Sequence, residues 1–166
     1  MMPNLLEIRI GNLLRERGLK LSLAESCTGG LVGDRITNLA GSSEYFWGSI
    51  VAYAYEAKVI LLHVSWDTLN TYGAVSREVV LEMAKGARSV LGTDIAISVT
   101  GIAGPGGGTE DKPVGTTWIG LAAADGEWTR QFRFTGDRIQ NKDSAADAAL
   151  QFLLEFLEGK LPPGEA

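Results

Sequence analysis

The chain of 166 residues is poor in the side chains that most often build catalytic and metal centres, with one cysteine and one histidine. Because Cys27 has no second cysteine as a partner, no intramolecular disulfide can form and no cysteine cluster can bind zinc. A Ser-His-Asp triad or a Cys-His dyad would depend on His63 alone. The setting of His63, Leu-Leu-His-Val at 61–64, is typical of a packed helix end, so we interpret this residue as structural rather than catalytic.

Positive charge is also scarce, since 15 Lys and Arg face 20 Asp and Glu and leave a net charge of −5. Extended nucleic-acid binding needs a basic face, so we expect no direct nucleic-acid partner. No apolar run approaches the roughly 20 residues of a membrane span, and Glu7 and Arg9 interrupt the apolar residues near the start. We therefore expect a cytoplasmic protein without a membrane partner.

The length of 166 residues predicts one domain over 1–166, and the periodicity of the apolar residues predicts that helices and strands alternate within it. Predicted helices span 5–17, 31–39, 56–64, 65–69, 77–91 and 141–157, and predicted strands span 20–23, 48–55, 94–100, 115–124 and 127–134. Asp125-Gly126 between the last two strands is a strong hairpin signal. This order predicts an α/β fold, a three-layer α/β/α sandwich whose sheet is mixed and mostly parallel, with a C-terminal hairpin followed by a long helix.

The stretch Ala-Glu-Ser-Cys-Thr-Gly-Gly at 24–30 lies between a predicted strand and a predicted helix. Ser26 and Thr28 are therefore at a strand-to-helix turn, and Gly29 and Gly30 open the helix. The free backbone N–H groups of such a turn suit a serine nucleophile with an oxyanion hole, and they equally suit a bound phosphate. Serine and threonine are also favoured there as plain helix caps, so the turn alone leaves these interpretations open.

A base for Ser26 has to come from elsewhere, because the chain offers no credible histidine. Lys58 would serve if burial near Tyr53 and Tyr55 lowered its pKa enough to accept the serine proton. The alternative is an ordinary solvated lysine. A glycine-rich loop follows Thr100 and includes Gly101, Gly104 and the glycines up to position 108. Its glycines either let a ligand approach the backbone closely or form a flexible connector. The loop does not match the P-loop pattern.

Several spaced motifs together resemble the CinA C-terminal domain family, whose members act as nicotinamide-nucleotide amidases. The resemblance covers nearly the whole chain. The motifs are Ala-Glu-Ser-Cys-Thr-Gly-Gly at 24–30, Ala-Gly-Ser-Ser at 40–43, Val-Ala-Tyr and Glu-Ala-Lys within 51–58, Tyr-Gly-Ala-Val-Ser at 72–76, and Gly-Ile-Ala-Gly-Pro with Lys-Pro-Val-Gly-Thr within 101–116.

The resemblance implies a homodimer that hydrolyses the carboxamide of nicotinamide mononucleotide to nicotinate mononucleotide and ammonia, without a metal or another cofactor. By position, Ser26 matches the nucleophile of the family, Lys58 its general base and Tyr53 a neighbouring aromatic hydroxyl. Backbone N–H groups after Ser26 would hold the oxyanion. The predicted substrate-binding residues are Thr28, Gly29, Gly30, Ser42, Ser43, Phe46, Thr100, Gly101, Gly104, Lys112, Arg138 and Lys142.

Within that set, the substrate phosphate is expected against the loop after Thr100 or against Ser42-Ser43, near a cation such as Lys112 or Arg138. The aromatic cluster at 45–47, which includes Phe46, either stacks on the pyridinium ring or belongs to the core or a dimer surface.

Two departures from the family pattern bear on substrate preference and rate. The segment Ala54-Tyr55 replaces a Ser-Asn pair that is common in the family, and Lys142 stands where an arginine is usual.

Three alternative functions remain open. They are a nucleotide-binding or regulatory module, a protein contact linked to competence or DNA damage, and an amidase for another substrate.

Overall fold

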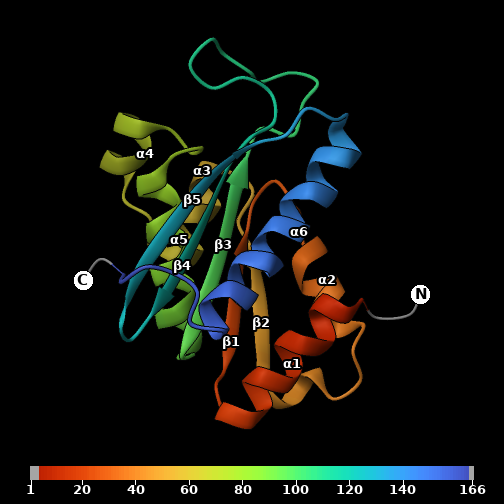
Figure 1. Cartoon of the computed structure of the whole chain (residues 1–166). Helices are drawn as coiled ribbons and strands as arrows, with labels where there is room; N and C mark the ends of the chain where they lie inside the picture. Colours follow the sequence, from red (N-terminus) through yellow and green to blue (C-terminus); the bar gives the residue numbers. More distant parts are fainter. Residues whose placement is uncertain (1–3, 165–166) are drawn as a thin grey trace.

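The computed structural model describes residues 4–164 and shows a five-stranded sheet between two layers of helices (Figure 1). This confirms the predicted three-layer α/β/α sandwich. The strands are β1 Leu21–Glu25, β2 Phe46–Val51, β3 Ile95–Gly101, β4 Thr116–Ala123 and β5 Gly126–Arg133. The helices are α1 Leu5–Arg17, α2 Leu31–Thr37, α3 Tyr55–Leu62, α4 Trp66–Tyr72, α5 Arg77–Leu91 and α6 Arg138–Leu157, with a short 3₁₀ helix η1 at Ser42–Glu44.

The sheet has the strand order β2-β1-β3-β4-β5, which makes β1 an inner strand between two parallel neighbours. Glu25, the last residue of β1, pairs with Val51 on β2 and with Val99 on β3. The strands β4 and β5 form the predicted hairpin and run antiparallel, so the sheet is mixed. Because β1, β2 and β3 end at the same edge, the segments that follow them gather there, which is where ligand sites of α/β sheets form.

Each face of the sheet has its own apolar core. Helices α1, α2 and α6 cover one face, where Leu23, Ile97 and Phe152 are buried (Figure 1). Helices α3, α4 and α5 cover the other, where Leu62, Leu69 and Met83 are buried. The side chains of β1 are buried on both faces, as expected for a strand inside a covered sheet.

Close packing of α3 on α5 depends on Gly86. A Cβ atom at this position would lie 1.9 Å from the carbonyl oxygen of Leu62, the last residue of α3. Only glycine therefore lets the two helices approach this closely. This contact matters for the site because α3 carries Lys58 towards the edge where β1 ends.

Two boundaries and the setting of His63 differ from the sequence prediction in ways that bear on the site. The strand predicted at 48–55 is Phe46–Val51, because the chain turns after Val51 and α3 begins at Tyr55. The last helix begins at Arg138 rather than at 141, because Asp137 and Gln140 form a capping box with hydrogen bonds of 2.9 Å in both directions. His63 does end a helix, with a left-handed φ of 58°, but its side chain is exposed rather than packed.

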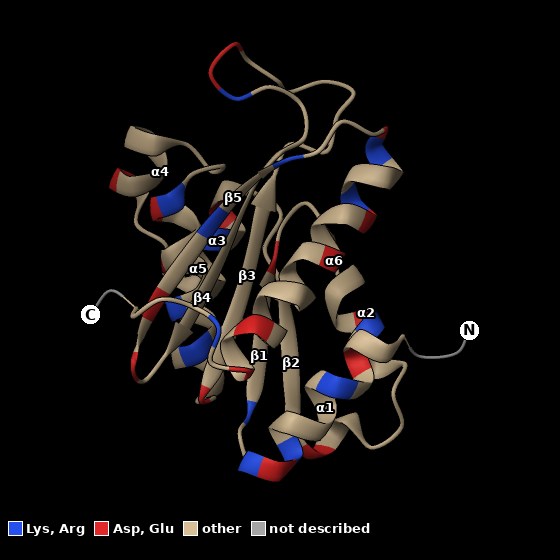
Figure 2. Cartoon of the chain, in the orientation of Figure 1, with Lys and Arg blue, Asp and Glu red and all other residues tan. Residues whose placement is uncertain are grey.

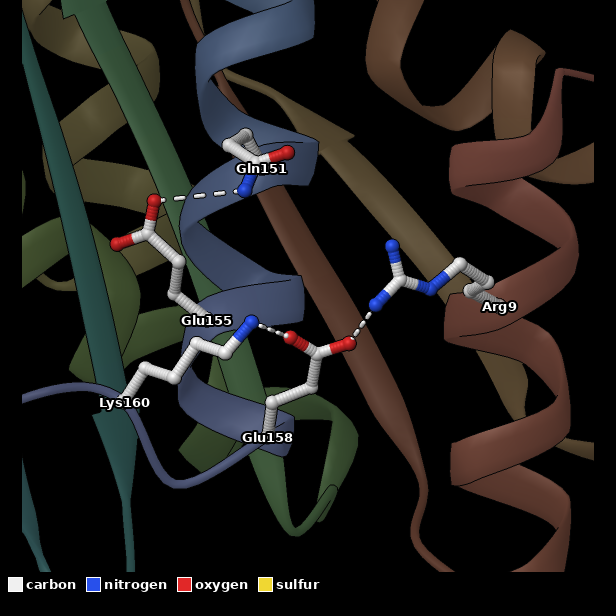
Figure 3. A network of polar contacts seen from close by, with 5 residues as sticks. All are labelled: Arg9, Gln151, Glu155, Glu158 and Lys160. Carbon is white, nitrogen blue, oxygen red and sulfur yellow. Dashed lines mark hydrogen bonds and ion pairs between the residues drawn. The ribbon is translucent and has the colours of Figure 1, made fainter.

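A polar network joins α1 to the carboxyl-terminal end of α6, far from the edge where β1 ends (Figures 1 and 3). Glu158 accepts from Arg9 of α1 and forms a 2.5 Å ion pair with Lys160, and both cations hold the pKa of Glu158 below its usual range. Glu155, which accepts from Gln151 at 3.4 Å, forms a 2.8 Å ion pair with Arg130 of β5. The network therefore joins α6 both to α1, in the same helix layer, and to β5 of the sheet, and its role is structural.

Among the described helices, α6 included, none combines the length and the apolar character that a membrane crossing requires. Within residues 4–164, no three His, Cys, Asp or Glu side chains gather into a group that could bind a metal ion.

Candidate active site at the end of strand β1

Ser26 is the first residue after β1 and lies at the strand-to-helix turn that the sequence predicts. Its backbone N–H donates to the carbonyl oxygen of Val99 at 3.0 Å, so the turn is fixed to β3. The residue is 7% exposed. Gly29 continues the turn with a left-handed φ of 61° and donates its N–H to the carbonyl oxygen of Ser26 at 3.0 Å. The hydroxyl therefore has a defined place at the edge of the sheet.

Lys58 meets Ser26, which the sequence alone could not establish. The Nζ atom of Lys58 lies 2.9 Å from Oγ of Ser26, and it donates to the carbonyl oxygens of Ala52 and Tyr53 at 2.9 Å each. The side chain of Lys58 is 1% exposed. The two carbonyl oxygens and the hydroxyl oxygen match the three N–H donors of the ammonium form. In the neutral form, the two carbonyls take the two N–H groups, and the lone pair faces the hydroxyl of Ser26 and can accept its proton.

Burial lowers the pKa of Lys58 from 10.5 to about 8. With that pKa, about one tenth of the molecules carry the neutral amine at pH 7. The sequence hypothesis that desolvation would make Lys58 a base is therefore supported by the burial and the contacts. Cys27, next to Ser26, is not a competing nucleophile, because burial raises the pKa of its thiol to about 12.

Two backbone donors are available beside Ser26. Within residues 4–164, the N–H groups of Cys27 and Thr28 donate to no backbone carbonyl, whereas those of Gly30, Val32 and Gly33 donate to the carboxylate of Glu25. The first two groups are therefore the candidates for an oxyanion hole. The N–H groups of Gly29 and Gly30, which the sequence also nominated, are engaged in the turn itself.

Tyr53 contributes its backbone to Lys58 and its hydroxyl to a different partner. The phenol oxygen accepts from Nη2 of Arg138 at 3.1 Å, and Nη1 of Arg138 donates to the carbonyl oxygen of Gly104 at 2.6 Å. Arg138 thus joins the segment after β2 to the loop after β3. The guanidinium group also borders a cavity of about 350 Å³ formed with Ala103, Val114 and other residues.

Lys142 follows one turn later on α6 and reaches the Ser26 turn. A Cβ atom placed on Gly29 would lie 4.0 Å from Nζ of Lys142. Figure 2 shows Lys and Arg gathered at the amino-terminal end of α6, the part of the helix that contains Arg138 and Lys142. Lys142 therefore lies beside the Ser26 turn, where it can meet an anionic group, whereas the guanidinium group of Arg138 is engaged by Tyr53 and Gly104.

The loop after β3 is held against the site by side chains. Thr100 donates its hydroxyl to the carbonyl oxygen of Ala74 at 2.8 Å, and Lys112 donates to that of Tyr72 at 2.5 Å. Gly101 lies against the turn, since a Cβ atom there would be 3.1 Å from Sγ of Cys27. Thr100 and Gly101 therefore belong to the floor of the site, whereas the ammonium group of Lys112 is engaged on α4.

The structure does not bring Ser42, Ser43 or Phe46 to Ser26. Phe46 begins β2 and pairs near Leu21, at the opposite end of the parallel strands, about 16 Å along β2 from Val51. Ser42 and Ser43 form η1 just before it. Phe46 packs against the core instead.

Sequence reasoning missed two buried polar residues that shape the site. Asn141 donates from Nδ2 to the carbonyl oxygen of Ala103 at 3.0 Å and accepts the N–H of Gly136 at 3.0 Å, so it fixes the glycine-rich loop to α6. Glu25 accepts five hydrogen bonds around the Ser26 turn. A carboxylate at the end of a buried strand was the available signal for Glu25, whereas Asn141 carried none.

Comparisons with known proteins agree on one family. The family model described as CinA C-terminal domain matches residues 4–157. A CinA-like protein of Chloroherpeton thalassium is 51% identical over 156 residues, which are 92% of this chain and 37% of that protein. The chain thus spans little more than a third of the length of this curated relative.

Solved structures of similar length resemble the chain closely. A competence-damaged protein (CinA) superfamily protein from Klebsiella pneumoniae matches with a TM-score of 0.89 and 36% identity, covering 93% of this chain and 96% of that one. A competence/damage inducible protein from Agrobacterium tumefaciens matches with a TM-score of 0.88 and 37% identity over 95% and 98% of the two chains.

Proposed function

The chain belongs to the CinA C-terminal domain family, and from this premise we propose that it is an amidohydrolase in which Ser26 and Lys58 form the catalytic pair. The proposed reaction converts nicotinamide mononucleotide and water to nicotinate mononucleotide and ammonia. The observation that carries the proposal is the 2.9 Å contact between Nζ of the buried Lys58 and Oγ of Ser26. The resemblance of the motifs to nicotinamide-nucleotide amidases supplies the substrate.

The chemistry follows from the two groups. Neutral Lys58 takes the hydroxyl proton while Oγ of Ser26 bonds to the amide carbon, and the N–H groups of Cys27 and Thr28 stabilise the oxyanion. Lys58 then returns the proton to the leaving nitrogen, and ammonia departs as the carbon–nitrogen bond breaks. Water attacks the resulting ester with Lys58 again as base, which frees the carboxylate and restores the hydroxyl of Ser26.

The cations of α6 suit the phosphate of the substrate. Lys142 lies near Gly29 at the Ser26 turn and is the first candidate, and Arg138 would join it by exchanging its hydrogen bond to the exposed Tyr53 hydroxyl for one to the phosphate. Lys112 and the Ser42-Ser43 pair are left out of the proposed phosphate site, because the former is bound to Tyr72 and the latter lies at the other end of β2.

The test is ammonia release from nicotinamide mononucleotide by the wild type and by Ser26→Ala and Lys58→Ala. We expect turnover in the wild type and a loss of at least about 1000-fold in each variant, with nucleotide binding retained. Ser89→Ala and Lys85→Ala, both at exposed positions on α5, are the matched controls. Turnover that survives in Ser26→Ala would refute the mechanism.

A nucleotide-binding module without turnover is the second candidate. It is favoured by the departures from the family pattern, Ala54-Tyr55 before Lys58 and Lys142 in place of an arginine, which alter the surroundings of the catalytic pair and leave the pair itself intact. Binding of the nucleotide by the wild type without release of ammonia would support it. The homodimer that the resemblance implies and the cytoplasmic location expected from the sequence are parts of the same proposal, and sedimentation of the purified chain tests the first.

A further inference from the structure

Glu25 is a buried carboxylate with no role in the proposed proton transfer. Its side chain is 1% exposed, and it directly precedes Ser26. Oε2 accepts from the hydroxyl of Thr28 at 2.7 Å and from the N–H groups of Gly30 at 3.1 Å and Val32 at 3.0 Å. Oε1 accepts from the N–H of Gly33 at 2.9 Å and from the hydroxyl of Ser49 on β2 at 2.8 Å.

These five bonds connect three parts of the molecule. The Thr28 bond closes the turn over Ser26, the three N–H bonds fix the first turn of α2, and the Ser49 bond fixes the edge strand β2. The packing leaves little room for rearrangement, since a Cβ atom on Gly33 would lie 3.2 Å from Cβ of Ser49. The carboxylate therefore joins the Ser26 turn and α2 to β2, the strand that leads directly into Ala52 and Tyr53, whose carbonyl oxygens accept from Lys58.

The contacts require a carboxylate rather than a group of the same shape. Backbone N–H groups are donors only, and each oxygen of Glu25 faces at least one of them. A glutamine would place its NH₂ group either against the N–H of Gly33 or against those of Gly30 and Val32. Either orientation leaves donors facing donors, so the isosteric amide cannot restore the arrangement.

We infer that Glu25 is a positioning residue for catalysis, whose clamp holds the turn so that the hydroxyl of Ser26 meets Lys58 and the N–H groups of Cys27 and Thr28 stay free for the oxyanion. By occupying the N–H groups at the start of α2 with an internal anion, Glu25 also keeps an anionic part of the substrate away from them. The inference rests on the proposed role of Ser26 as nucleophile. It adds that precise placement of this nucleophile depends on a residue that touches no substrate.

The experiment compares the wild type with Glu25→Gln in two assays. The first is phosphonylation of Ser26 by a fluorophosphonate probe, in which Oγ bonds to phosphorus, fluoride leaves and the proton passes to Lys58. The second is amide hydrolysis, with kcat and KM separated. Because displacement of a reacting group by about 1 Å costs on the order of 100-fold, we expect both the labelling rate and kcat to fall 10- to 100-fold, with KM changed less than threefold.

The matched control is Glu82→Gln. Glu82 also holds the start of a helix, accepting from the N–H of Ser65 at 2.8 Å and from the hydroxyl of Thr68 at 2.7 Å, but these partners belong to α4. We expect this variant to lose stability while its labelling rate stays within twofold of the wild type. Equal labelling rates in Glu25→Gln and the wild type would overturn the inference, as would a fall in KM alone.

Amide hydrogen exchange over residues 26–33 distinguishes a failure of this inference from a failure of the proposed function. A wild type that neither hydrolyses amides nor reacts with the probe refutes Ser26 as nucleophile, and with it the catalytic part of the inference. Faster exchange in Glu25→Gln would still establish the clamp. If Glu25→Gln does not fold, Ser49→Ala removes one of the five bonds, and we expect two- to fivefold slower labelling; an unchanged rate would then overturn the inference.

Discussion

Replacing Lys58 by methionine tests the electrostatics of the site without any substrate. The ammonium form of Lys58 is disfavoured in the folded protein because burial lowers its pKa from 10.5 to about 8. Between these values the unfolded chain binds more protons than the folded one, so this group makes the wild type more stable as pH rises. Lys58→Met has no such titration, and its free energy of unfolding lacks that contribution.

The magnitude follows from the two pKa values. At 1.36 kcal/mol for each unit, the charged lysine costs the wild type ~3 kcal/mol at pH 7, and the cost falls to ~1 kcal/mol at pH 10. The variant also loses the hydrogen bonds to Ala52, Tyr53 and Ser26, but that loss is nearly the same at both pH values. The free energy of unfolding of the wild type, relative to that of Lys58→Met, should therefore rise by ~2 kcal/mol from pH 7 to pH 10.

Urea unfolding of both proteins from pH 6 to pH 10 measures this difference. Groups elsewhere titrate in both proteins and cancel in the comparison. Lys85→Met, at an exposed position, controls for the loss of one positive charge. If the free energies of unfolding of the wild type and Lys58→Met changed in parallel over the whole range, burial would not lower the pKa of Lys58. The proposal that Lys58 acts as a neutral base would then be refuted.

Three further results are expected. The rate of probe labelling or hydrolysis should rise tenfold per pH unit below about 8 and level off above it, because only neutral Lys58 accepts the proton; a flat profile contradicts this. Tyr53→Phe should leave kcat within threefold, since Lys58 contacts the Tyr53 carbonyl and not its hydroxyl. Gly86→Ala should lower the free energy of unfolding by ~2 kcal/mol or more, measured in urea, because its Cβ would meet the carbonyl oxygen of Leu62.

The fold was largely predictable because the signals were local. The buried strand β3 and the amphipathic α5 follow from apolar periodicity, and the β4–β5 hairpin follows from Asp125-Gly126. The start of α6 was misplaced because its first turn, Arg138 to Gln140, is exposed and carries no apolar period. The capping pair Asp137 and Gln140 was the signal that would have found it.

The site was predictable only in part, because it is assembled from elements far apart in the chain. Ser26 was marked by its turn, but its contact with Lys58 depends on α3 packing over α5 at Gly86, a close approach that no pattern near Lys58 encodes. Ser42 and Phe46 were attractive by residue type, yet the parallel direction of β2 places them at the wrong end of the sheet. Strand direction is a tertiary property, so composition could not reveal it.

The departure from the family pattern at Ala54-Tyr55 lies close to Lys58 in sequence, but neither residue contacts Nζ of Lys58. Ala54 accepts the backbone N–H of Lys58 at 3.1 Å through its carbonyl oxygen, which any residue could do. The hydroxyl of Tyr55 accepts the N–H of Ala74 at 3.2 Å, and Thr100 donates to the carbonyl of the same residue. The large aromatic side chain therefore acts on the segment before α5 and leaves Nζ of Lys58 with its acceptors. The ring of Tyr55 also faces that of Trp66, with the centroids 6.5 Å apart, so an effect of this departure on substrate preference would come from the Tyr55 side chain and not from a changed contact between Lys58 and Ser26.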